Sequence, residues 1–286
     1  MKFGAHMSIS GGLHHALAHG TRAGCDTVQL FTKNQQQWRA RPLTSVDIDA
    51  FERAKQEHIM APLLVHDSYL INLASPKDDL WQKSIEAFGE ELDRCRQLGI
   101  PYLVTHPGAH TGSGEQAGLQ RVAEALNRLF DAQVGGDTTV LIETTAGQGS
   151  TLGYRFEHLA ELIDRVEHSE RLAVCVDTCH MLAAGYDFRT PETYAATFEA
   201  FDRIVGLDRI KAFHLNDSVK DVGSRTDRHA HIGDGFVGLE GFRLVVNDPR
   251  FIGLPMILET PKGDDLAEDI ENLTKLRNLR TAVDKE

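Results

Sequence analysis

The sequence has no long hydrophobic run, and this absence excludes whole classes of protein. Within its 286 residues, no apolar stretch is long enough to cross a bilayer. The N-terminal segment, residues 1–6, also lacks the apolar core of a signal peptide. We therefore expect a cytoplasmic chain with no membrane partner.

Cysteine is scarce, and its four copies do not pair in the sequence. None belongs to a C-x-x-C motif, which would indicate a redox or zinc-binding element. Disulfides are also rare in a reducing cytoplasm. We therefore expect four free thiols, including Cys179 despite its place beside His180; the others are Cys25, Cys95 and Cys175.

Basic residues are outnumbered by acidic ones. The chain has 30 Lys and Arg against 42 Asp and Glu, a formal net charge of -12 and a pI near 5.6. Taken alone, this surplus argues against a polyanionic partner. Two considerations weaken this objection. Many of the acids could bind metal ions, which would offset their charge, and two of the loops described below are locally basic.

Linkers, low-complexity segments and long repeats are absent, so residues 1–286 are predicted to form a single domain. What recurs is a short apolar run followed by a stretch of helical pattern. The predicted strands cover residues 2–6, 27–31, 62–66, 102–106, 138–143, 172–177, 210–215 and 255–259. The predicted helices cover residues 11–24, 44–58, 80–98, 118–131, 156–166, 191–203, 241–246 and 265–280.

Eight such units in a chain of this length predict the α/β class and a single (β/α)8 TIM barrel. A doubly wound open sheet is the alternative. The barrel is favoured because polar residues gather where the strands end, and this C-terminal rim is where barrel loops build active sites.

The sixth predicted strand shows this pattern clearly. Its apolar run, residues 172–176, ends on Asp177, and His180 follows three residues later in RLAVCVDTCH. A carboxylate and an imidazole at the lip of a buried strand can bind a divalent metal ion. A capping aspartate with a solvated histidine would look the same, so the pair gains weight only because the pattern recurs.

Five histidines and four carboxylates follow the ends of six successive strands. Four ionised acids cannot share a small site without cations between them. Imidazoles with carboxylates suit Zn²⁺ first, and also Mn²⁺ or Fe²⁺. Because nine ligands are too many for one ion, we predict two or three ions at the rim. The candidates are His66, His106, Glu143, Asp177, His180, His214, Asp227, His229 and Glu259.

Each member of this ring also has a structural alternative. A lone strand-end histidine such as His66 commonly forms only a hydrogen bond, Glu143 or Glu259 could form a salt bridge, and the loop at 227–229 could be solvated. Chance does not readily explain six such strand ends in series. His6 also ends a strand and is a candidate for supporting the ligands from behind. The remaining histidines are predicted to lie on the surface or in loops: His14, His15, His19, His58, His110, His158, His168 and His231.

Three motifs give the chain a resemblance to a known family. HDSYLINLA at 66–74, VCVDTCH at 174–180 and HLNDSVKDVGSRTDRH at 214–229 belong to the third, sixth and seventh strands and their loops. FTKNQQQWRA at 31–40, HPGAH at 106–110 and TAGQGS at 145–150 add to them. With these motifs the sequence resembles, nearly end to end, the endonuclease IV family of apurinic/apyrimidinic (AP) endonucleases.

The resemblance implies a barrel that holds three zinc ions, with Mn²⁺ or Fe²⁺ as a replacement at one site. Matched position by position, one ion would take His66, His106 and Glu143. A second would take Glu143 as a bridge, with Asp177, His214 and Glu259. The third would take His180, Asp227 and His229. Glu143 and Glu259 would also be catalytic, Glu259 as a ligand, an orienting group for water or a proton acceptor.

The resemblance also implies an activity and a substrate. The enzyme, expected to be a monomer, would hydrolyse the phosphodiester bond 5′ to an abasic site in double-stranded DNA, leave a 3′-hydroxyl, and trim blocked 3′ ends. The abasic nucleotide would be flipped out of the helix. The DNA would be held by loops after the second, third and seventh strands, through Lys33, Gln36, Trp38, Arg39, Tyr69, Lys220, Arg225 and Arg228.

Two positions in these loops depart from the family pattern. Gln36 stands where many members have arginine, and Val219 precedes Lys220 where members usually have lysine directly. Both departures affect the expected DNA contacts rather than the chemistry. Trp38 and Tyr69 could alternatively only pack the loops on the barrel.

Two other classes of function share parts of the pattern. A metal-dependent sugar isomerase or epimerase would use the same barrel, with one or two ions and a small closed pocket. A non-catalytic protein that binds metal or damaged DNA would have coordinatively closed ions and would not cut. The long polar loop at 33–41 and the DRH sequence at 227–229 favour the nuclease.

Overall fold

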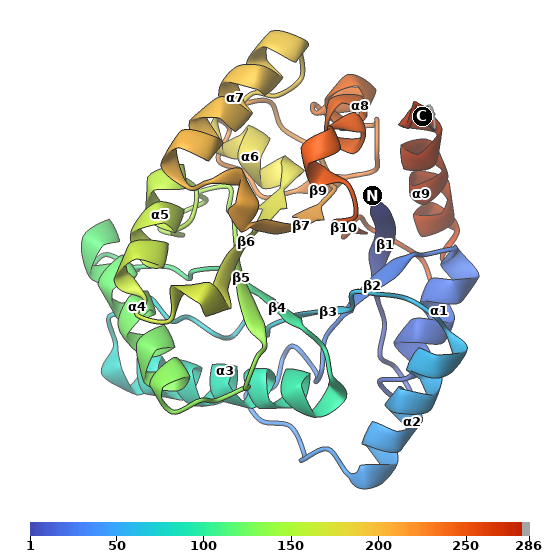
Figure 1. Ribbon diagram of the computed structural model, residues 1–286. Coiled ribbons are helices and arrows are strands. Elements are labelled where there is room, and N and C mark those ends of the chain that lie inside the picture. Colours follow the sequence, from blue (N-terminus) through green and yellow to red (C-terminus); the bar gives the residue numbers. More distant parts are fainter. Residues whose placement is uncertain (282–286) are drawn as a thin grey trace.

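The computed structural model describes residues 1–281, in which eight parallel strands form a closed barrel (Figure 1). Neighbours pair in the order β1-β2-β3-β4-β5-β6-β7-β10, and β10 closes the ring by pairing with β1. The barrel strands are β1 (Lys2–Met7), β2 (Thr27–Leu30), β3 (Leu64–His66), β4 (Tyr102–Thr105), β5 (Thr139–Glu143), β6 (Leu172–Asp177), β7 (Ile210–His214) and β10 (Pro255–Leu258). The predicted TIM barrel is confirmed.

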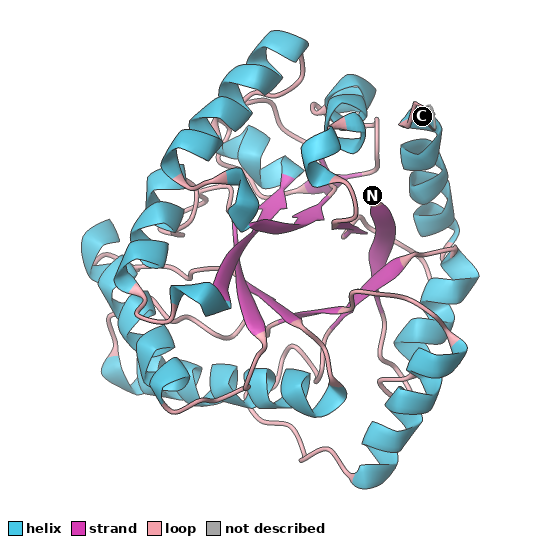
Figure 2. Cartoon of the chain, in the orientation of Figure 1, coloured by secondary structure: helices cyan, strands magenta, loops and turns pink. Residues whose placement is uncertain are grey.

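Helices surround the barrel on its outside, as the cyan ribbons show (Figure 2). No helix of residues 1–281 is both long and apolar enough to cross a membrane. The helices are α1 (His15–Ala23), α2 (Ser45–Glu57), α3 (Asp78–Leu98), α4 (Glu115–Asp131), α5 (Phe156–Arg165), α6 (Thr178–Ala184), α7 (Pro191–Ile204), α8 (Gly238–Asn247) and α9 (Ala267–Leu279). Short 3-10 turns precede three of the strands: η1 (Ser169–Arg171), η2 (Leu207–Arg209) and η3 (Pro249–Phe251).

Helix ends follow signals that are visible in the sequence. At the start of α2, the Thr44 hydroxyl accepts a hydrogen bond from the Asp47 N–H, and the Asp47 carboxylate accepts one from the Thr44 N–H, which together form a capping box. At the end of α3, Gly99 adopts a φ of 62°, a conformation that favours glycine. Both helix ends lie where the sequence predicts them.

The structure also contains elements that the sequence pattern did not predict. Helix α6 follows β6 directly, because the Asp177 carboxylate caps it by accepting a hydrogen bond from the His180 N–H at 2.8 Å. An antiparallel pair, β8 (Asp217–Ser218) and β9 (His229–Ala230), braces the loop after β7. Helix α1 begins four residues later than expected, since Gly11 and Gly12 have positive φ values that a right-handed helix excludes.

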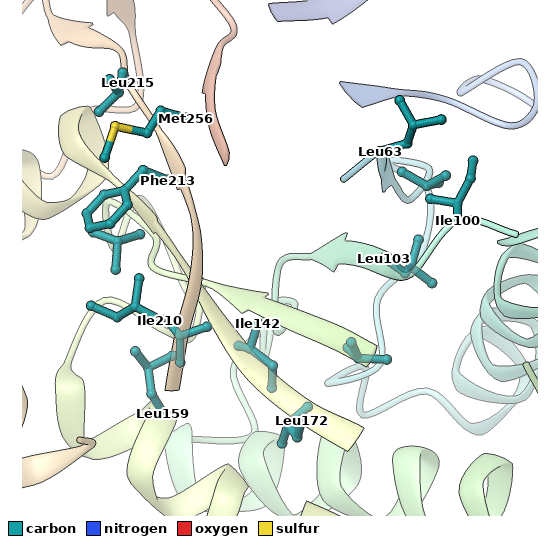
Figure 3. Packing of buried hydrophobic residues seen from close by; sticks show 14 of the residues in the cluster. Leu63, Ile100, Leu103, Ile142, Leu159, Leu172, Ile210, Phe213, Leu215 and Met256 are labelled. Atoms are coloured by element: carbon teal, nitrogen blue, oxygen red, sulfur yellow. The ribbon is translucent and has the colours of Figure 1, made fainter. Parts of the chain in front are cut away.

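Apolar side chains pack in two layers. The larger layer lies between the strands and the helices, where Leu103, Ile142 and Phe213 are among its buried members (Figure 3). A separate, smaller cluster comes from six neighbouring strands and fills the barrel interior with Leu64, Val104, Leu141, Ala173, Cys175, Ala212 and Ile257. This inner cluster forms the floor on which the functional site stands.

Candidate metal centre

The barrel interior changes from apolar to polar at the carboxyl ends of the strands. Because side chains alternate between the two faces of a strand, a residue two positions beyond an interior residue also points inward. Glu143 follows Leu141 on β5 in this way, and Asp177 follows Cys175 on β6. The same step of two leads from Leu64 to His66, from Val104 to His106, from Ala212 to His214 and from Ile257 to Glu259. A layer of imidazoles and carboxylates therefore covers the apolar floor.

The first group in this layer consists of His66, His106 and Glu143. The Nε2 atoms of His66 and His106 lie 3.3 Å and 3.4 Å from the same carboxylate oxygen, Oε2 of Glu143. His66 is buried, and its Nδ1–H donates to the main-chain oxygen of Asp67 at 2.9 Å. Nε2 of His66 is therefore the nitrogen that faces the group. The three ligand atoms lie within 4.8 Å of one another, as one shared ion requires.

Glu143 takes part in a second group with its other oxygen. Oε1 of Glu143 lies 3.2 Å from Nδ1 of His214, and that nitrogen is also 3.2 Å from Oε2 of Glu259. Asp177 completes the group, with Oδ2 at 4.0 Å from the same nitrogen. Glu143 thus stands between the two groups with one oxygen directed to each.

The third group consists of His180, Asp227 and His229. Oδ1 of Asp227 lies 3.2 Å from Nε2 of His180 and 3.6 Å from Nε2 of His229. The other nitrogen of each ring is held by the main chain: Nδ1–H of His180 donates to the oxygen of Thr144 at 2.8 Å, and that of His229 to the oxygen of Glu259 at 3.2 Å. All nine residues of the predicted ring are therefore brought together in three groups.

Several ligand atoms of these groups are buried and have no hydrogen-bond partner among residues 1–281. A buried polar atom without a partner costs free energy, so such atoms call for an explanation. They are Glu143 Oε1, His180 Nε2, His214 Nδ1 and His229 Nε2. Cations bound between imidazole and carboxylate groups would supply the missing interactions, and this set of donors suits zinc. The residues present therefore fit a metal centre.

The electrostatics of the groups also favour positive charge at their centre. Burial acts to raise the pKa of Glu143, but the nearby His214 and His106 outweigh it and hold this pKa well below its ordinary value. Burial acts to lower the pKa of His180, but Asp177 and other carboxylates outweigh it and raise this pKa well above its ordinary value. These opposite shifts favour a positive charge on His180 beside the ionised Glu143, and a bound cation would supply that charge in place of a proton.

Cys179 lies close enough to Asp177 and His229 to form a further grouping of metal-ligand type. The thiol is fully buried, however, and donates to the main-chain oxygen of Arg228 at 3.5 Å. Burial raises its pKa to about 12, so the thiolate that a metal needs is disfavoured. None of the four cysteines forms a disulfide, as the sequence predicts.

Six of the eight predicted DNA-contact residues are exposed on the loops after β2, β3 and β7. Tyr69 has 69% of its surface exposed, and its ring centroid lies 6.0 Å from that of His66, which places the tyrosine beside the first group. The guanidinium of Arg225 stacks 4.0 Å above the ring of Tyr154. The exposed residues are Gln36, Arg39, Tyr69, Lys220, Arg225 and Arg228.

The other two lie against α3 beneath the loop. Lys33 is only 5% exposed, and its Nζ lies 3.5 Å from Oε1 of the buried Glu91 and donates to the Trp38 main-chain oxygen at 3.1 Å. This burial removes Lys33 from the predicted DNA contacts and gives it a structural role inside the loop. Trp38 is half-buried, with the ammonium of Lys83 from α3 4.3 Å from its ring centroid.

The structure places two amides in the site that the sequence did not single out. Gln29, fully buried on β2, donates to Glu259 at 2.6 Å and contacts His6 Nδ1 at 3.0 Å. Asn216 donates to Oδ2 of Asp177 at 2.7 Å, and its Oδ1 accepts from the Glu259 N–H at 2.8 Å. The only signal for Gln29 was a glutamine inside an apolar strand; for Asn216 there was none. His6 lies behind Glu259, as predicted for a supporting residue.

One of the histidines predicted to be superficial is buried. His158 lies on α5 with 3% of its surface exposed, where its Nδ1 accepts from the Gly153 N–H at 3.2 Å and its Nε2 contacts Glu115 at 3.3 Å. A polar residue on the inner face of a helix carries no sign of burial in the sequence when its partners lie on other elements. The prediction for His158 was therefore wrong.

The chain matches known proteins over most of its length. A family model described as a xylose isomerase-like TIM barrel matches residues 17–276. A protein of Chloroflexus aggregans named probable endonuclease 4 is 62% identical over 278 residues, which cover 97% of each chain. The chain belongs to the endonuclease IV family.

Solved structures agree with this assignment. The crystal structure of endonuclease IV from Thermus thermophilus is 38% identical to the chain, covers 98% of both chains and superposes with a TM-score of 0.85. A D-tagatose 3-epimerase-like protein also superposes, with a TM-score of 0.74 over 98% of both chains, but at 17% identity. The epimerase-like protein therefore shares the fold, and the sequence likeness is with endonuclease IV.

Proposed function

We propose that the protein is a zinc-dependent DNA-repair endonuclease that cleaves the phosphodiester bond 5′ to an abasic site and leaves a 3′-hydroxyl. As a member of the endonuclease IV family it is a hydrolase. The observation that carries the proposal is the set of three ligand groups, two of which share Glu143, in which four inward-facing ligand atoms are buried without hydrogen-bond partners. Each group would hold one zinc ion, and Mn²⁺ or Fe²⁺ could replace zinc at one of them.

Zinc ions bound here would lower the pKa of water and neutralise charge on the phosphate. The chain's own residues set the geometry. Glu143 directs one oxygen to each of two groups and so fixes their separation. Glu259 is held by Gln29 and by Asn216, with 18% of its side chain exposed, and is placed to orient water or to accept a proton.

The exposed loop residues would hold duplex DNA over the rim. Arg39, Lys220 and Arg228 carry cationic groups for phosphates. Tyr69 stands exposed beside the first ligand group, where an aromatic wedge could enter the base stack as the abasic nucleotide leaves it. A locally basic rim would offset the net charge of -12. Trimming of blocked 3′ ends would use the same centre.

Two alternatives are less well supported. A sugar isomerase or epimerase needs fewer ligands than the nine gathered here, and the epimerase-like neighbour shares only the fold. A non-catalytic binding protein would close its metal coordination with protein ligands, whereas the first and third groups each offer three. Three protein ligands leave a position open, as catalytic zinc sites do.

The decisive experiment is incubation of the purified protein with a duplex that carries one abasic site, with and without chelator. We expect a single cut 5′ to the site, loss of cutting with chelator, and recovery on addition of zinc. Elemental analysis of protein purified without chelator should give about three ions per chain, by the ligand count of catalytic zinc sites. A single ion, or magnesium alone, would contradict the trinuclear centre, and binding without cutting would favour the non-catalytic alternative.

A further inference from the structure

A single buried glutamine connects three residues at the base of the rim. Gln29 lies on β2 and is fully buried. Its Oε1 lies 2.8 Å from Nε2 of His214, and its Nε2 lies 2.6 Å from Oε1 of Glu259 and 3.0 Å from Nδ1 of His6. Both polar atoms of one side chain are thus used, on a strand whose neighbouring residues Val28 and Leu30 are buried and apolar.

The chemistry of the partners fixes the direction of each hydrogen bond. An ionised carboxylate only accepts, so the amide NH2 must face Glu259, and the amide oxygen must then face His214. An amide oxygen only accepts, so Nε2 of His214 carries the proton. In the neutral ring, the form that binds a cation, the lone pair of His214 is therefore on Nδ1, the buried nitrogen that faces Glu143 and Glu259 without a hydrogen-bond partner.

The way His214 is held differs from that of three other histidines in the ring. His66, His180 and His229 each donate Nδ1–H to a main-chain oxygen, so the backbone fold alone orients their rings. His214 instead presents Nδ1 to its group and is held through Nε2 by a side chain. Its orientation depends on a residue that can be replaced without altering the backbone.

We infer that Gln29 is a positioning residue for the second ligand group: it fixes which nitrogen of His214 faces the divalent cation and restrains the Glu259 carboxylate beside it. The inference rests on the proposed metal centre. Hydrogen-bond partners of metal ligands set ring orientation and tautomer, and their loss typically lowers metal affinity by about 10–100-fold. Gln29 contacts His214 and Glu259, which belong to the second group alone, so its effect should be confined to the ion that this group would hold.

The test is zinc binding by Gln29→Met, which keeps the length and volume of the side chain and removes both polar atoms. The full chain, stripped of metal, is titrated with zinc in competition with a chromophoric chelator, so that the readout does not depend on cleavage. We expect three sites in the wild type, and in the variant one site that binds about 10–100-fold more weakly with two unchanged. The matched control is Thr27→Val, which removes the buried hydrogen bond from Thr27 to the Pro62 oxygen on the same strand, away from the rim.

The outcomes separate the inference from the function on which it rests. Selective loss at one site in Gln29→Met, with three intact sites in Thr27→Val, supports the positioning role. If Gln29→Met binds three zinc ions as tightly as the wild type, the inference is overturned and the metal centre stays in place. The same loss of zinc affinity in both variants would also overturn the inference, because it would show a general effect of a weakened strand. A wild type that takes up no zinc would overturn both.

Discussion

Oε2 of Glu143 lies 3.3 Å from Nε2 of His66, while the second oxygen of the same carboxylate turns away to the neighbouring group. The two oxygens of this one side chain at the end of β5 therefore face different ligand groups. A residue in this position sets the spacing between two ligand groups. Two-metal sites that catalyse phosphoryl transfer hold their ions about 3.5–4 Å apart.

The first prediction is that Glu143→Gln folds but loses cleavage by several orders of magnitude. The substitution keeps the shape of the side chain and replaces one oxygen by an amide nitrogen, which does not coordinate a cation. Fewer ions should bind, and positioning and water activation should fail together. DNA binding should persist in part, since the loops are unchanged. Single-turnover cleavage of abasic duplex by the folded variant measures the effect.

A matched control exists on α9, where Glu271→Gln makes the same chemical change at an exposed position paired with Lys275. This variant should cut at the wild-type rate and bind the same number of ions. Near-normal cleavage by Glu143→Gln, with fewer ions bound, would show that the chemistry belongs to another part of the rim.

The alternation of strand and helix was sufficient to predict the barrel, and the strand ends were sufficient to predict that a ring of imidazoles and carboxylates forms at one rim. The division of that ring into three groups, with Asp227 and His229 in the third, came from the family resemblance. Every strand of a parallel barrel ends at one rim, so residues at six strand ends converge even though up to 193 positions separate them, as between His66 and Glu259. Periodicity alone fixes this convergence because side chains alternate with a period of two.

Other features depend on contacts between elements and could not be predicted. Lysine is usually a surface residue, but Lys33 is buried because its ammonium pairs with the carboxylate of Glu91 on α3. Gln29 has no unusual neighbours in sequence, and its role depends on Glu259, 230 positions away. Helix α6 begins on the residue directly after β6, where Asp177 caps it. Because no loop separates the strand from the helix, the sequence contains no turn signal that marks the start of the helix.

The second prediction concerns His158 and acid pH. Burial lowers the pKa of His158, against the opposing influence of Glu115. The unfolded chain takes up a proton near pH 6.5, while the folded chain does so only at lower pH, so the wild type should lose stability as the pH falls below about 6.5. His158→Asn, whose amide oxygen can accept from the Gly153 N–H, has no such proton to gain.

Urea denaturation at pH 7.5 and at pH 5.5 measures both proteins. The difference in unfolding free energy between them should shift in favour of the variant at the lower pH. Loss of metal in acid affects both chains alike and cancels in this difference. A constant difference at the two pH values would show that His158 takes no part in the acid response.

The third prediction concerns the loops over the rim. Tyr69→Ala and Arg39→Ala should weaken DNA binding or cleavage with little change in stability, because both side chains are largely exposed. If Arg39 contacts a phosphate, its removal should reduce the dependence of log affinity on log salt by about 0.9, the counterion release of one contact. Binding isotherms over a range of salt concentrations measure this slope.

Arg243→Ala provides the charge-matched control, since Arg243 on α8 has 43% of its side chain exposed and, in the described chain, forms an ion pair only with Glu240. It removes one positive charge away from the loops after β2, β3 and β7, and should leave the salt slope unchanged. Wild-type affinity and activity in both loop variants would assign Tyr69 and Arg39 to packing.

The fourth prediction concerns the buried charges that hold the loop of residues 32–41 on α3. The Thr32 hydroxyl donates to Oε2 of Glu91 at 2.5 Å and accepts from Nε of Arg94 at 3.0 Å, and Nη1 of Arg94 donates to the Arg41 main-chain oxygen at 3.1 Å. Together with the pair between Lys33 and Glu91, these contacts tie both ends of the loop to one helix. The exposed Gln36 and Arg39 are carried between those ends.

Glu91→Gln should therefore destabilise the protein more than Lys33→Met. Removing the carboxylate leaves Lys33 without its ion-pair partner and Arg94 without the anion that it reaches through the Thr32 hydroxyl, and breaking a buried pair in this way costs about 3–5 kcal/mol. Removing the ammonium leaves Glu91 still linked to Arg94 through Thr32, so the loss should be smaller. Urea denaturation of both variants measures the order of their unfolding free energies.

DNA affinity should fall with Glu91→Gln, because the loop loses its anchor, while the number of bound ions stays the same. Equal destabilisation by the two substitutions would show that Arg94 does not share the carboxylate, and an unchanged DNA affinity would separate the anchor from the DNA-binding surface.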